Sequence, residues 1–122
     1  MKIMCLSDLH LDHNERKLQK RLIHPLADFI NKEKPDIFLV AGDIAGTVKV
    51  GTRYLNELQE KITAKILAVP GNHDQWTNTD SSWNEYNLFK EQAFSLIENP
   101  FVINDSHVII GDLGWYDYAY GV

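Results

Sequence analysis

Three short polar stretches hold the residues of this chain that are best suited to metal chemistry. They are Asp8-Leu9-His10, Gly42-Asp43 and Gly71-Asn72-His73-Asp74, and each directly follows an apolar run. Carboxylate oxygens, amide oxygens and imidazole nitrogens are the ligands that hard and borderline divalent ions take in proteins. Each stretch alone is a weak signal, but the three together predict a site for divalent metal ions.

The spacing of these residues indicates how they would be used. Asp8 and His10 are two residues apart, so in an extended backbone they would project to the same side. Gly42 allows a tight turn before Asp43, whose two carboxylate oxygens could bridge two ions. Asn72 offers a neutral oxygen that would bind an ion without adding negative charge.

His73 and Asp74 complete the third stretch. An imidazole can carry a proton near neutral pH, and an adjacent carboxylate could orient it and favour its protonated form. Structural alternatives stay open for the single residues. Asp8 and Asp43 could cap helices, and Asn72 could occupy a left-handed turn position. Asp12 and His13 are expected in a solvated loop, although they could face the cleft that would hold the metal ions.

The elements that must position these residues follow from the apolar pattern. Pro25 predicts a kink or a helix that restarts with this proline in its first turn, and Thr47 is expected to cap the next helix. The expected strands are residues 2–6, 36–40 and 65–69, the expected helices fall within 11–34, 47–62 and 82–97, and a hairpin turn is expected at 104–106.

Strands that alternate with helices predict an α/β fold, with a βαβαβ-type sheet flanked by helices. The first three strands are unbroken apolar runs, as expected where both faces of a sheet are covered. In such sheets the functional loops gather beyond the carboxyl ends of the strands, and all three polar stretches lie there. We interpret residues 1–122 as a single domain.

Composition narrows the function classes. The 122 residues include 12 basic and 17 acidic side chains, for a formal charge of −5. This makes a nucleic-acid partner unlikely, although bound cations would reverse the local field. Cys5 is the single cysteine and is expected to be buried. No apolar run approaches a membrane span, so a cytoplasmic protein is expected.

Aromatic residues gather at two further places. The segment 111–120 could line a pocket or pack in the core, and the region of Trp76 and Trp83 is expected to form a packed loop rather than a lid.

The blocks Ser7-Asp8-Leu9-His10, Ala41-Gly42-Asp43 and Pro70-Gly71-Asn72-His73-Asp74 resemble the first signature blocks of the calcineurin-like metallophosphoesterase superfamily. The resemblance spans residues 3–74. It implies that Asp8 and His10 hold one metal ion, that Asp43 bridges two ions and that Asn72 holds the second. It also implies that His73 contacts the substrate phosphate or protonates the leaving group, with support from Asp74.

The activity that the resemblance implies is hydrolysis of phosphomonoesters or phosphodiesters by a metal-bound hydroxide. The mixed ligand set suits two ions of Mn, Fe or Zn. An inactive protein-binding module with the same fold is the alternative, and a nuclease of the same superfamily is a further one.

The chain departs from the family pattern after His73. The later Gly-His and Gly-His-x-His blocks of the family have no counterpart, since His107 lies in neither context. We therefore expect half of the family's α/β sandwich, as a fragment of a longer enzyme or a naturally short relative. Such a chain would bind metal weakly and have little or no activity. It would also expose an apolar sheet face, which could bind a second copy or another chain.

Overall fold

The computed structural model describes residues 1–75 and 82–114, and its strand–helix alternation confirms the α/β class. The strands are β1 (Ile3–Leu6), β2 (Ile37–Ala41), β3 (Lys65–Val69), β4 (Phe101–Asn104) and β5 (His107–Ile109). The helices are α1 (Leu11–Leu18), α2 (Ile23–Glu33), α3 (Val48–Gln59) and α4 (Ser82–Lys90). Trp76 and the aromatic residues of 115–120 lie outside the described residues.

The central sheet of the described residues has the order β1-β2-β3, and both pairings are parallel. Ile37 of β2 pairs with Ile3 on one side and with Lys65 on the other. The strands β4 and β5 form the expected antiparallel hairpin around Asp105 and Ser106. Because the three parallel strands end at one edge, the loops that carry the polar stretches meet there.

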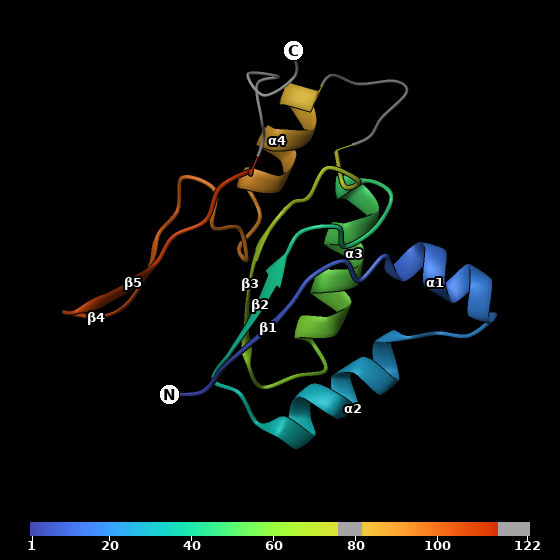
Figure 1. The fold of residues 1–122 in the computed structure, drawn as a ribbon, viewed down its shortest axis with the longest axis horizontal. Coiled ribbons are helices and arrows are strands. Elements are labelled where there is room, and N and C mark those ends of the chain that lie inside the picture. The colour runs from blue at the N-terminus through green and yellow to red at the C-terminus, as the bar shows by residue number, and fades with distance from the viewer. Residues whose placement is uncertain (76–81, 115–122) are drawn as a thin grey trace, which may run out of the picture.

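Two apolar clusters cover the two faces of this sheet. On one face, Phe38 and Ile66 pack in a cluster with Ile30 of α2 and Leu55 of α3. On the other face, Ile37 and Leu67 pack with Leu96 and with side chains of the hairpin. Figure 1 shows α2 and α3 on one side of the sheet and the β4–β5 hairpin on the other.

The expectation that both faces are covered is correct for β2 and β3 but wrong for β1. Ile3 is 44% exposed, and Cys5, which was expected to be buried, is exposed as well. The hairpin packs over Ile37, Leu67 and their neighbours, so it leaves the outward face of the edge strand open. Association of a second chain with this face remains a prediction.

The helices α2 and α3 begin as the sequence predicts. Pro25 lies in the first turn of α2, and Thr47 Oγ1 accepts a hydrogen bond from Val50 N at 3.2 Å. The helix α3 ends at Gln59, earlier than residue 62. The Gln59 side chain donates to Ala64 O and accepts from Ile66 N, which joins the end of α3 to the start of β3.

The helical stripe expected to reach residue 97 stops with α4 at Lys90. Beyond it, Ala68 of β3 donates to Phe94 O at 2.8 Å and accepts from Leu96 N at 3.0 Å. Leu96 and Ile97 are buried as their apolar character predicts, but they are buried against the edge of the sheet rather than in a helix. Among the described residues, no helix is both long and apolar enough to span a bilayer.

Candidate metal centre

The loops that follow β1 and β2 are joined along their backbones. Asp8 N donates to Gly42 O at 3.1 Å, His10 N donates to Asp43 O at 2.9 Å, and Leu11 N donates to Ile44 O at 2.8 Å. These bonds continue the pairing of the two parallel strands past their ends. They place the first two polar stretches side by side, although the stretches are more than thirty residues apart in the sequence.

Asp8, His10 and Asp43 all adopt left-handed backbone conformations, with φ of 53°, 42° and 52°. The expectation that Asp8 and His10 share a side through an extended backbone is therefore wrong. A left-handed conformation costs a residue with a side chain roughly 1–2 kcal/mol. Such conformations cluster at functional sites, where the surrounding structure holds them in place.

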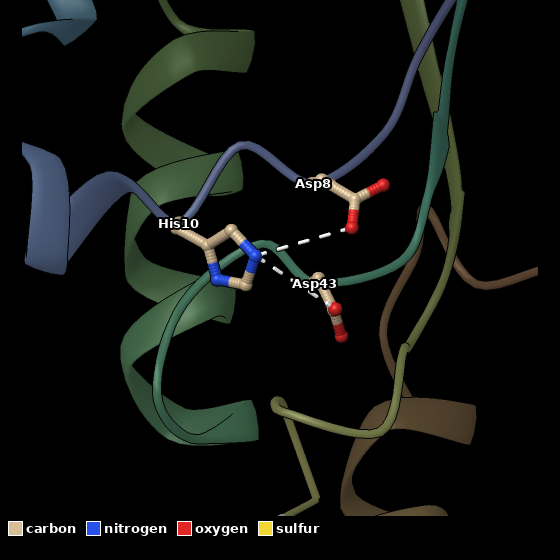
Figure 2. Close-up of side chains that lie close together, drawn as sticks. All are labelled: Asp8, His10 and Asp43. Carbon is tan, nitrogen blue, oxygen red and sulfur yellow. Dashed lines mark ion pairs between the residues drawn. The ribbon is translucent and has the colours of Figure 1, made fainter.

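The three side chains form a compact cluster (Figure 2). His10 Nε2 lies 3.9 Å from Asp8 Oδ1 and 3.8 Å from Asp43 Oδ2. One possible ligand atom from each residue lies within 4.8 Å of the other two. The Asp43 side chain is only 12% exposed whereas that of Asp8 is 68% exposed, so the cluster opens to solvent on the Asp8 side.

Each carboxylate of the cluster uses one oxygen to fix its position. Ser7 Oγ donates to Asp8 Oδ2 at 2.6 Å, and His73 N donates to Asp43 Oδ1 at 3.0 Å. The other oxygen of each carboxylate faces His10. The side chains are thus held by hydrogen bonds while an oxygen of each stays directed towards the imidazole.

The third polar stretch reaches the same place. The His73 ring lies edge-on to the His10 ring, with centroids 5.0 Å apart and an interplanar angle of 86°. Asn72 is exposed and directly precedes the backbone N–H that binds Asp43. The structure therefore brings His73 to the edge of the cluster, and Asn72 is its neighbour in the chain. Metal ligation by Asn72 remains a prediction.

Asp74 has a structural role that sequence reasoning missed. Its side chain is fully buried, and its oxygens accept hydrogen bonds from Ile44 N and Ala45 N, both at 2.9 Å, and from Gly71 N at 2.7 Å. Burial raises the pKa of Asp74, while these backbone hydrogen bonds oppose the rise. The carboxylate ties the loop after β3 to the loop after β2. No local pattern indicates this, because its partners Ile44 and Ala45 are about thirty residues away.

Gly42 and Gly71 make room for this junction. Gly42 has a φ of 83°, and a Cβ atom there would lie 2.8 Å from Gly71 Cα. A Cβ atom on Gly71 would overlap the Asp43 carboxylate. Only glycine at these two positions lets the loops approach closely enough to hold Asp43 in place.

Asp12 and His13, which were expected in a solvated loop, lie in α1. Together with His10, Arg16, Gly46 and His73, they line an open cavity of about 380 Å³. Asp12 Oδ2 accepts from Gly46 N at 3.1 Å, which anchors the start of α1 to the loop after β2. The cluster of Asp8, His10 and Asp43 therefore lies beside a cavity that is open to solvent.

The donor set of the cluster fits a divalent ion. Asp8 and Asp43 supply carboxylate oxygens and His10 supplies an imidazole nitrogen, all from within one small volume. Oxygen together with imidazole nitrogen suits borderline ions such as Mn, Fe and Zn. The part of the chain that the structure describes thus offers three possible ligand atoms for one ion.

Two comparisons with known proteins were informative to different degrees. No solved structure matches the chain significantly. A family model described as calcineurin-like phosphoesterase matches residues 1–120, which includes all three polar stretches and nearly the whole chain. The chain therefore belongs to the calcineurin-like phosphoesterase family.

Proposed function

We propose that this chain supplies metal ligands of a dinuclear-metal phosphoesterase, which hydrolyses phosphomonoesters or phosphodiesters, and that the chain by itself has weak activity or none. The observation that carries the proposal is the convergence of Asp8, His10 and Asp43, whose possible ligand atoms lie within 4.8 Å of one another. Membership of the calcineurin-like phosphoesterase family supports the same class of reaction.

In this proposal Asp8 and His10 hold one ion, Asp43 contributes to two and Asn72 holds the second. Mn, Fe or Zn would suit these ligands. When bound, such ions activate a water molecule and neutralise charge on the phosphoryl oxygens. Fixing Asp8 and Asp43 by Ser7 and by the backbone of His73 lowers the entropy cost of assembling the site.

His73 would act on the substrate. Its ring lies beside that of His10 and faces the cavity next to the cluster, where it could hold a phosphoryl oxygen or give a proton to the leaving oxygen. Asp74 would keep His73 in place through the backbone, because its carboxylate holds Gly71 and the loop after β2.

A calorimetric titration with Mn(II) tests the metal site. We expect weak but saturable binding that falls more than about tenfold in Asp43→Asn, because the buried carboxylate is a central ligand. Asp105→Asn is the matched control, since Asp105 is exposed in the hairpin turn and far along the chain from the loops of the site. Equal affinity in Asp43→Asn and in the wild type would contradict the proposal.

Hydrolysis is tested with p-nitrophenyl phosphate and bis(p-nitrophenyl) phosphate in the presence of Mn(II). His73→Asn should lower kcat by about 10²–10⁴-fold if His73 transfers a proton, while Mn(II) binding is retained. Turnover that is unchanged in both His73→Asn and Asp43→Asn would count against the proposal.

A further inference from the structure

The cavity beside Asp8, His10 and Asp43 is lined by one arginine, Arg16, to which the proposed function gives no role. Arg16 lines it together with His13, and the two residues lie three apart on α1, on the same face of the helix. His10 and His73 line the same cavity, so this face of α1 borders the space in which a substrate would meet the metal ions.

Arg16 differs from the other arginine near this helix. Arg21 is paired with Glu57 at 2.6 Å and lies 3.5 Å from Glu15. Within residues 1–75 and 82–114, by contrast, no carboxylate lies within ion-pair distance of the Arg16 guanidinium. Its donors are therefore free to bind an anion.

The acidic residue of the cavity does not compete for Arg16. Both oxygens of Asp12 accept backbone hydrogen bonds, from His13 N at 2.9 Å and from Gly46 N at 3.1 Å. Asp12 still adds a negative charge to the wall of the cavity, which opposes binding of an anion. The guanidinium of Arg16, which stays charged at all ordinary pH values, is the group of the lining that offsets this charge.

We propose that Arg16, assisted by His13, binds a second anionic group of the substrate, so that the preferred substrates are phosphoesters whose leaving group carries a carboxylate or another phosphate. This assignment rests on the proposed function, because the scissile phosphate is placed at the metal cluster. A guanidinium presents paired N–H donors that match a carboxylate or a phosphate, and His13 offers a further ring nitrogen.

The first test requires neither metal nor turnover. The chain in a chelating buffer is titrated with inorganic phosphate while the His13 imidazole and Arg16 guanidinium resonances are followed by NMR. We expect saturable shifts of both, with the dissociation constant raised about tenfold in Arg16→Gln because a charge-assisted pair is lost. Lys17→Gln is the matched control, since Lys17 is the neighbouring cation but does not line the cavity. Unchanged affinity in Arg16→Gln, or no shift at either side chain, would overturn the assignment.

The second test separates the two proposals. With Mn(II) present, kcat and KM are compared for glycerol 2-phosphate, 2-phosphoglycerate and glycerol 1,2-bisphosphate. We expect a lower KM for one or both of the doubly anionic compounds, and loss of this advantage in Arg16→Gln but not in Lys17→Gln. The compound whose KM is lowered shows whether the second group is a carboxylate or a phosphate. Equal KM values for all three would overturn the role of Arg16 and leave the phosphoesterase intact. If the chain shows no turnover, the Mn(II) titration of the wild type and Asp43→Asn decides the proposed function, and the phosphate titration decides the role of Arg16.

Discussion

Gly71 lies directly against Asp43, so that any side chain at position 71 would occupy the space of the Asp43 carboxylate. The two residues come from different loops, after β3 and after β2, and they meet at the centre of the candidate metal site. A residue without ligand atoms therefore controls the position of one of the ligands.

Gly71→Ala should displace Asp43 or prevent the loops from closing. We expect Mn(II) affinity to fall at least tenfold, measured by calorimetry, and the thermal midpoint to fall as well. Gly114→Ala is the matched control, because a Cβ atom there would have no heavy atom within 4 Å. Wild-type metal affinity in Gly71→Ala would show that the close approach does not hold Asp43.

Asp74→Ala should destabilise the chain strongly. The substitution leaves the N–H groups of Ile44, Ala45 and Gly71 without their buried acceptor. The loss is expected to be about 3–5 kcal/mol in the free energy of unfolding, measured by denaturant titration. Asp28→Asn, at an exposed position of α2, should change it by less than about 0.5 kcal/mol. Equal losses of stability in Asp74→Ala and Asp28→Asn would show that the Asp74 carboxylate does not hold the two loops together.

Thr47→Ala should destabilise α3 by about 1 kcal/mol, because Val50 N loses the hydroxyl that accepts its hydrogen bond. Thr47→Ser keeps the hydroxyl and should retain most of the stability. Equilibrium unfolding followed by far-ultraviolet circular dichroism measures both. If the two variants lost stability equally, the methyl group rather than the cap would be the cause.

Tyr54 should make the stability of the protein depend on pH in the alkaline range. Burial, together with the hydrogen bond from its hydroxyl to Glu15 at 2.8 Å, raises the pKa of Tyr54 to about 12 from its ordinary value of 10.0. Below the ordinary value the hydroxyl is protonated in both states, and its contribution to stability is fully present. As pH rises towards 12, the unfolded chain loses this proton first, so unfolding becomes more favourable.

Tyr54→Phe should therefore remove a tyrosine that titrates late in the absorbance at 295 nm. The stability difference between the wild type and Tyr54→Phe should shrink as the pH rises from 10 to 12. An ordinary titration midpoint for Tyr54 would show that the bond to Glu15 is not maintained in solution.

Much of the local structure could be predicted from the sequence. The apolar runs that form β1, β2 and β3, the first-turn position of Pro25 and the cap at Thr47 all depend on neighbouring residues. The residue types of the candidate site could be recognised for the same reason, since each motif is a short continuous stretch that follows a strand. Periodicity and capping act over one or two turns, so the sequence contains them directly.

The arrangement of the site was decided by tertiary structure. Asp8 and His10 meet Asp43 because the backbones of two loops bond to each other, in left-handed conformations that no spacing rule predicts. The clamp by Asp74 and the exposure of Cys5 likewise depend on which segments pack together and which strand lies at the edge. Such contacts join residues that are far apart in the chain, and the pattern of near neighbours does not encode which distant backbone group will be within hydrogen-bond reach.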